Sequence, residues 1–217
     1  MTSTAAALEA IELQLAWSSL AGSALDLSLA PGEGVLLSGP SGSGKSSLLR
    51  ALVALDPYQS GELRVAGKSL SHLGPPAFRR RVLQVPQRPP RPTGTVLDWI
   101  QEVREFSGLS LDGVDQQARK LDLPEAVFSS VCAKLSEGEF TRVLLALALS
   151  FQPAVLLLDE SLAAQDGDRR QRLLDALQQY QQQGGAWVLA THDLPSVEGA
   201  TSWRVREGTV QRQGVVT

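Results

Sequence analysis

The clearest chemistry in this chain of 217 residues lies in one short run of small residues and a lysine. The pattern G-x-x-x-x-G-K-[ST] is fitted by Gly39, Pro40, Ser41, Gly42, Ser43, Gly44, Lys45 and Ser46, and Ser47 follows directly. Glycines there let backbone N–H groups approach phosphate oxygens, and the lysine reaches the β- and γ-phosphates. This phosphate loop (residues 39–47) therefore predicts a site for a nucleoside triphosphate, with the hydroxyl of Ser46 as a Mg²⁺ ligand.

The residues on either side of the phosphate loop supply the context that such a loop requires. The apolar run 34–38 before it is typical of a buried parallel strand, and residues 45 to about 55 after it form a helical pattern. The positive end of that helix dipole would face the phosphates. The alternative, an accidental turn rich in Gly and Ser, would lack this context.

Two carboxylates follow a second apolar run at residues 154–158. At the end of a strand, Asp159 would hold Mg²⁺ directly or through water, and Glu160 would polarise the attacking water as a general base. The structural alternative is an acidic cap on an ordinary strand. The upstream phosphate loop favours the catalytic interpretation.

Three further features follow in a fixed order along the chain. Gln87 follows the strand-like run 82–85, the signature segment (residues 135–139) reads Leu-Ser-Glu-Gly-Glu before a long helical run, and His192 follows the strand-like run 186–191. With the two motifs above, this order resembles the ATP-binding cassette (ABC) ATPase family over nearly the whole chain.

The resemblance implies a role for each of these residues. Gln87 would sense Mg²⁺ and the attacking water and couple the site to a partner. Ser136 and Gly138 would bind the γ-phosphate of ATP held by the opposite subunit. His192 would act as a switch on the γ-phosphate, although a histidine taken alone is more often packed or on the surface.

Two further assignments come from the same resemblance. Asp166 falls where the family places the aspartate of a loop that contacts the second subunit. Trp17 falls where an aromatic ring commonly stacks on adenine, and its alternative role is that of a strand residue covering the sheet.

The chain also departs from the family pattern, Leu-Ser-Gly-Gly-Gln in the signature segment. Glu137 and Glu139 replace Gly and Gln, and residues 161–165 differ from the usual Pro-Thr-Ser-Ala-Leu. A carboxylate at Glu137 would repel a γ-phosphate unless it points away or finds a cation such as Arg142. The favoured interpretation is that Glu137 caps the helix and points outward. Weakened activation of the opposite site stays open, and the detailed subunit contacts are in doubt.

The elements expected around these residues give an α/β fold. We expect a P-loop NTPase core with a mainly parallel sheet, an N-terminal antiparallel β layer and a small helical subdomain at about residues 93–150, all in one domain spanning 1–217. Strands are expected at 8 to about 17, 24–30, 34–38, 62–66, 82–85, 154–158 and 186–191, with a loop at 56–61.

Helical periodicity dominates the second half of the chain. Val96, Trp99, Ile100 and Val103 are spaced to line one helix face, and shorter helices follow with breaks at Gly108 and Pro124. Further along, we expect a helix at about 166–183, a short helix after residue 192 and a closing hairpin near residue 208.

Composition limits the class of protein. The 43% hydrophobic content suits one α/β core, and a net charge of −3 does not suggest a nucleic-acid binder. The lone Cys132 cannot form an internal disulfide and no signal precedes the first strand, which favours the cytosol. The apolar run 143–149 is far shorter than the about 20 residues of a membrane span, so a membrane role would need a partner.

The resemblance implies an ATPase that uses ATP and Mg²⁺ and works at the cytoplasmic face of a membrane. Two copies, or this chain and a related cassette, would enclose two ATP molecules and drive transport through separate permease subunits. Two alternatives stay open: a regulatory ATPase acting on a soluble or nucleic-acid complex, and a subunit that holds ATP with little hydrolysis. The local basic cluster Arg79, Arg80, Arg81, Arg88 and Arg91 is either a solvated loop face or an electrostatic contact for the permease.

Overall fold

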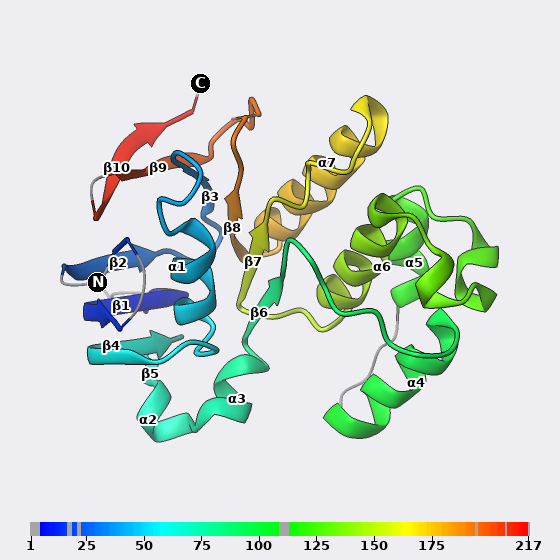
Figure 1. Ribbon diagram of the computed structural model, residues 1–217, viewed down its shortest axis with the longest axis horizontal. Coiled ribbons are helices and arrows are strands. Elements are labelled where there is room, and N and C mark those ends of the chain that lie inside the picture. Colours follow the sequence, from blue (N-terminus) through cyan, green and yellow to red (C-terminus); the bar gives the residue numbers. More distant parts are fainter. Residues whose placement is uncertain are drawn as a thin grey trace.

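The computed structural model describes residues 5–16, 19–20, 23–108, 113–193, 195–206 and 208–216. Trp17, the expected adenine-stacking residue, lies outside the described residues. Figure 1 shows the strands gathered on one side of the molecule and a group of helices on the other. The phosphate loop lies in the strand-rich part.

A six-stranded sheet with the order β10-β9-β3-β8-β7-β6 forms the centre of the molecule. Every neighbouring pair is parallel except the β9–β10 hairpin, which closes the chain as expected. The mainly parallel core is therefore confirmed. Its strands are β3 (Gly34–Ser38), β6 (Val82–Val85), β7 (Val155–Asp159), β8 (Ala186–Ala190), β9 (Thr201–Arg206) and β10 (Thr209–Val215).

A second, antiparallel sheet with the order β2-β1-β4-β5 forms the expected N-terminal layer. Its strands are β1 (Leu8–Leu15), β2 (Ala24–Leu29), β4 (Tyr58–Val65) and β5 (Lys68–Ser69). Most of the loop expected at 56–61 is wrong, because β4 already begins at Tyr58. The turn-forming Gly61 instead sits at a bulge, where φ is 100° and a Cβ would lie 2.5 Å from the carbonyl oxygen of Glu12.

The helices connect and cover the central sheet. They are α1 (Lys45–Leu52), α2 (Leu70–Leu73), α3 (Pro75–Arg79), α4 (Val96–Ser107), α5 (Val114–Lys120), α6 (Glu137–Ser150) and α7 (Gly167–Gln182), with short 3₁₀ turns at Glu125–Ser129 and Cys132–Lys134. The short helix expected after His192 is wrong: the described residues from 191 to 200 contain none. Pro195 lacks a backbone N–H and Gly199 has a φ of 77°, and both interrupt a helix there.

Strand alternation sends the side chains of β3 into two separate cores. Leu36 packs with Trp187 and residues of α6 and α7 on one face of the sheet. Val35 and Leu37 pack with α1 and the antiparallel layer on the other face. Both faces are therefore buried, which holds the carboxyl ends of the parallel strands in fixed positions.

No helix within the described ranges combines the length and apolar character that crossing a membrane requires.

Candidate functional site

The phosphate loop joins the end of β3 to the start of α1. Gly44 is the N-cap of α1 in the left-handed conformation, with a φ of 101°. At Gly39, a Cβ would lie 2.7 Å from the carbonyl oxygen of Val205. These two positions therefore require glycine, and they bring the free N–H groups of the first turn of α1 to the surface of the loop.

Lys45 is buried inside the phosphate loop. Its Nζ donates to the carbonyl oxygens of Gly39 at 2.9 Å and Pro40 at 3.2 Å. The ammonium is thus fixed at the centre of the loop, where backbone N–H groups and a helix N-terminus also favour an anion.

Asp159 ends β7 and is only 4% exposed. Burial raises the pKa of its carboxyl group, while a hydrogen bond from Ser46 lowers it. Its Oδ1 is buried without a hydrogen-bond partner among the described residues. A buried carboxylate oxygen without a partner, next to a serine hydroxyl, fits a hard cation such as Mg²⁺.

Glu160 stands between two side chains delivered by the neighbouring strands. The Nε2 of Gln87 donates to its Oε2 at 2.5 Å, and the Nε2 of His192 lies 2.6 Å from its Oε1. The three residues follow β6, β7 and β8, which are adjacent in the sheet. Glu160 has a φ of 51°, an uncommon conformation for a residue with a side chain and one that recurs at functional sites.

A cavity of about 450 Å³ brings the phosphate loop and these three residues together. Gln87, Glu160 and His192 line it together with residues 41–47. Ser19 also lines the cavity, and its hydroxyl donates to the carbonyl oxygen of Gly42 at 3.0 Å. No motif contains Ser19, and closeness to Trp17 was its only signal in the sequence.

The signature segment lies at the N-terminus of α6, outside the set of residues that line this cavity. Ser136 is the N-cap and forms a capping box with Glu139. Gly138 packs so closely on the segment after Glu160 that a Cβ would lie 2.6 Å from the carbonyl oxygen of Ala164. The structure therefore places Ser136 and Gly138 together at the start of α6, and neither lines the cavity at the phosphate loop.

Glu137 is 69% exposed and pairs with Arg91, whose Nη2 lies 3.0 Å from its Oε1. The expected outward direction agrees with this exposure, but the capping role is wrong because Ser136 is the N-cap. Arg142 is not its cation either: this buried arginine donates to the carbonyl oxygens of Leu121 and Asp122.

Asp166 is the N-cap of α7, where its carboxylate accepts hydrogen bonds from the backbone and side chain of Arg169. Within one chain it therefore stabilises a helix end. Its expected contact with a second subunit remains a prediction.

Removing the Glu137 side chain tests whether it hinders or helps the site. We expect Glu137→Gly to leave ATP hydrolysis unchanged or faster, because the carboxylate already has a cation partner. The free energy of unfolding should fall by about 1 kcal/mol or less, since an exposed ion pair contributes little and glycine weakens a helix modestly. Phosphate release and thermal unfolding would measure both. A severe loss of hydrolysis in a fully folded variant would show a positive role for the carboxylate.

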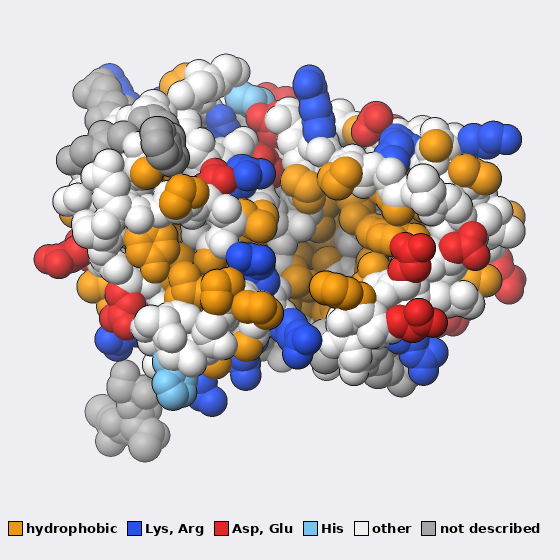
Figure 2. All heavy atoms as spheres, turned by 60° about the horizontal axis from the view of Figure 1, so that its bottom comes forward, with side chains coloured by type: hydrophobic (Ala, Val, Ile, Leu, Met, Phe, Trp, Pro, Cys, Tyr) orange, Lys and Arg blue, Asp and Glu red, His pale blue; other side chains and the backbone are white. Residues whose placement is uncertain are grey.

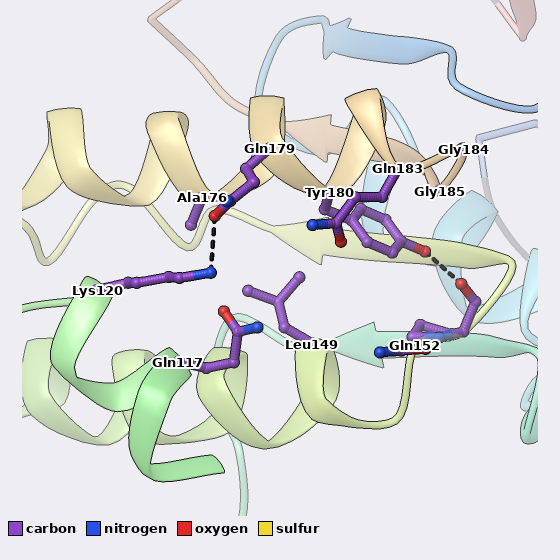
Figure 3. A pocket seen from close by; sticks show the side chains of 11 residues that line it. Gln117, Lys120, Leu149, Gln152, Ala176, Gln179, Tyr180, Gln183, Gly184 and Gly185 are labelled. Atoms are coloured by element: carbon purple, nitrogen blue, oxygen red, sulfur yellow. Dashed lines mark hydrogen bonds between the residues drawn. The ribbon is translucent and has the colours of Figure 1, made fainter. Parts of the chain in front are cut away.

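A second cavity, of about 270 Å³, lies at the opposite ends of the strands, where Pro153 and Gly185 precede β7 and β8. Figure 3 shows it between the C-terminal ends of α5, α6 and α7, with glutamine side chains around it. Lys120 donates to the Oε1 of Gln179 at 2.8 Å, and the Tyr180 hydroxyl donates to the carbonyl oxygen of Pro153 at 2.6 Å. Its lining contains no carboxylate, so it offers no general base for hydrolysis.

Residues 23–163 match the protein family described as ABC transporter. Three relatives illustrate the match. The spermidine/putrescine import ATP-binding protein PotA of Pseudomonas fluorescens is 37% identical over 78% of this chain and 48% of its own length. The probable iron export ATP-binding protein FetA of Escherichia coli is 34% identical over 81% of this chain and 80% of its own length. The nickel import ATP-binding protein NikE of Brucella abortus is 34% identical over 80% and 70%.

Solved structures share the fold. The ATP-binding subunit of an ABC transporter superposes with a TM-score of 0.84 at 23% identity, over 95% of this chain and 89% of the other. A dimeric ATP-binding cassette in a post-hydrolysis state, bound to ADP and Pi, gives 0.81 at 21% identity, over 95% and 98%. The expected fold class is therefore confirmed.

Proposed function

The chain belongs to the ABC transporter family, and from this premise we propose that it is the ATP-binding subunit of a transporter, hydrolysing ATP to move a substrate through separate membrane subunits. The observation that carries the proposal is the Glu160 carboxylate, held between Gln87 and His192 at the mouth of a phosphate loop. Relatives of nearly equal identity are named for spermidine/putrescine import, nickel import and probable iron export. Similarity to these relatives therefore supports the ATP chemistry and does not identify the cargo.

The residues around the cavity divide the work of hydrolysis. Lys45 and the N–H groups of the phosphate loop bind the phosphates and neutralise their charge. Glu160 orients the attacking water and accepts its proton, while His192 contacts both this carboxylate and the γ-phosphate. Most of the acceleration comes from positioning and charge neutralisation.

The oxygen donors of this site suit Mg²⁺. Ser46, Gln87 and Asp159 would hold it. When bound, the ion would supply positive charge that neutralises the phosphates.

A second subunit completes the site in this proposal. Ser136 and Gly138 stand at the N-terminus of α6, whose N–H groups favour an anion, yet neither lines the cavity at the phosphate loop of their own chain. Two chains arranged head to tail would place each signature segment on the other chain's ATP. Either two copies of this chain or one copy and a related cassette satisfy this arrangement.

The permease subunits would dock at the cytoplasmic face of the membrane. Figure 2 shows a hollow lined by hydrophobic side chains between the strand-rich and helical parts, with lysine and arginine side chains beside it. Arg79 and Arg80 are exposed at the end of α3 and suit such a contact. Arg91 does not belong to that surface, because its side chain is turned inward and is only 22% exposed.

Recovery of the membrane partner tests the transporter proposal. Tagged Glu160→Gln protein would be purified from its host cells in mild detergent with ATP and Mg²⁺, and its partners identified by mass spectrometry. We expect a membrane protein with several spans. Adding Lys45→Ala should reduce its recovery by about tenfold or more, because the amine that binds the phosphates is gone.

The exposed Lys68 on β5 provides the matched control, and Lys68→Ala should leave the recovery unchanged. Recovery of soluble proteins or nucleic acid alone would contradict the transporter role and favour a regulatory ATPase.

A further inference from the structure

Arg91 points into the protein from the proline-rich segment (residues 86–92). Its Nη1 donates to the carbonyl oxygens of Cys132 at 2.8 Å and Leu135 at 2.6 Å, and its Nη2 lies 3.0 Å from the Oε1 of Glu137. The guanidinium also covers the ring of the buried Phe140, with Cζ 4.8 Å from the ring centroid. One side chain therefore fixes the whole turn that leads into α6.

The backbone supports the same contact. The carbonyl oxygen of Gly94 accepts a hydrogen bond from the N–H of Cys132 at 3.0 Å, and Thr95 forms an isolated antiparallel bridge with Val131. The residues after the proline-rich segment are thus paired with the residues before the signature segment. Arg91 is placed by this pairing and not by a flexible loop.

Glu137 creates an electrostatic conflict at this turn. The N–H groups at the start of α6 attract an anion, whereas a free carboxylate in the same turn would repel one. Arg91 binds that carboxylate from the side of the proline-rich segment. The guanidinium therefore compensates the charge that Glu137 adds to the signature segment.

The proline-rich segment also contacts Glu160, the general base in this chain's own site. Gln87 binds Glu160, and Arg91, four residues after Gln87, binds the signature segment. Four prolines between residues 86 and 92 restrict the backbone, because each fixes φ near −65°. This stiff segment therefore connects Glu160 with the signature segment.

We infer that Arg91 is a positioning residue: it holds the Glu137 carboxylate away from the N-terminus of α6, so that the signature segment accepts the γ-phosphate of ATP bound by a second subunit. This inference rests on the proposed function, because it requires ATP enclosed between two chains. Lysine could not replace Arg91, since one ammonium lacks the planar fork that serves two carbonyls and a carboxylate together.

The test measures ATP-driven dimerisation by analytical ultracentrifugation. All variants carry Glu160→Gln, and ATP is titrated with Mg²⁺ present. Arg91→Gln is expected to raise the ATP concentration for half-maximal dimerisation about tenfold, because an uncompensated carboxylate then faces the phosphate. Adding Glu137→Gln should restore this concentration to within about threefold of the parent, because no charge remains to be compensated.

Two further measurements separate this role from a merely structural one. Arg119→Gln breaks an exposed ion pair with Asp115 on α5 and is the matched arginine control, expected to leave dimerisation unchanged. Binding of a fluorescent ADP to the monomer reports the chain's own phosphate loop, and we expect Arg91→Gln to leave it within about twofold. Thermal unfolding shows whether each variant is folded.

The outcomes discriminate between the role of Arg91 and the proposed function. Unchanged ATP dependence in Arg91→Gln would overturn the inference alone. A double variant no better than Arg91→Gln would also overturn it, because the loss would then come from the broken carbonyl contacts. A Glu160→Gln parent that binds ADP but stays monomeric at saturating ATP would overturn the proposed dimer, and the role of Arg91 with it.

Discussion

Replacing Glu160 with glutamine is expected to slow ATP hydrolysis by about 10³-fold while ATP affinity stays within about threefold of the parent. The amide keeps the size of the side chain and can still accept one hydrogen bond from Gln87 or His192. It cannot take a proton from the attacking water. Phosphate release at saturating ATP and equilibrium binding of ATP would measure the two effects separately.

The exposed Glu125 offers a matched control on the helical side of the molecule, and Glu125→Gln should leave both quantities unchanged. Mg²⁺-dependent hydrolysis within about tenfold of the parent would show that Glu160 is not the general base. Lost ATP binding would show instead that the carboxylate is needed to form the site.

The hydrogen bonds of Glu160 suggest how the base is controlled. Both of its carboxylate oxygens have a partner: Oε2 accepts from Gln87, and Oε1 lies against His192. Each oxygen keeps a second lone pair that can accept from the attacking water, and the two partners fix the direction of the carboxylate. Because the partners follow β6 and β8, on either side of β7, a small shift at either strand end would change the orientation of the base.

Local sequence patterns predicted the parts of the site that depend on one element at a time. The strand before the phosphate loop was expected at 34–38, and β3 has these bounds. The run 82–85 likewise corresponds to β6. Turn residues and apolar runs determine such elements locally, so Gln87, Glu160 and His192 could each be placed after a strand.

Contacts between distant segments could not be predicted in this way. The partner of Glu137 proved to be Arg91, 46 positions earlier, because the pairing of residues 94–96 with 130–132 brings them together. Arg142 is nearer to Glu137 in sequence, but it is buried and donates to the carbonyl oxygens of Leu121 and Asp122. Neither the partner of Glu137 nor that of Arg142 can be inferred from hydrophobic periodicity or motif spacing, because both depend on how distant segments pack.

Replacing Asp159 with asparagine is expected to stabilise the fold and stop hydrolysis at the same time. The carboxylate is buried, burial raises its pKa, and Oδ1 has no hydrogen-bond partner among the described residues. A neutral amide removes the cost of burying that charge, so the unfolding midpoint without nucleotide should rise by about 2–4 °C. Hydrolysis should fall by about 10³-fold, because the amide is a far weaker ligand for Mg²⁺.

Thermal unfolding with ATP, with and without Mg²⁺, shows why the buried charge is retained. In the parent, adding Mg²⁺ to ATP should raise the midpoint further, because the cation would neutralise the charges of Asp159 and the phosphates. In Asp159→Asn, Mg²⁺ should add little, and the exposed Asp175→Asn should behave as the parent. A less stable asparagine variant that still responds to Mg²⁺ would place the metal elsewhere. The expected pattern means that Asp159 lowers the stability of the empty site and recovers that free energy only when metal and nucleotide bind together.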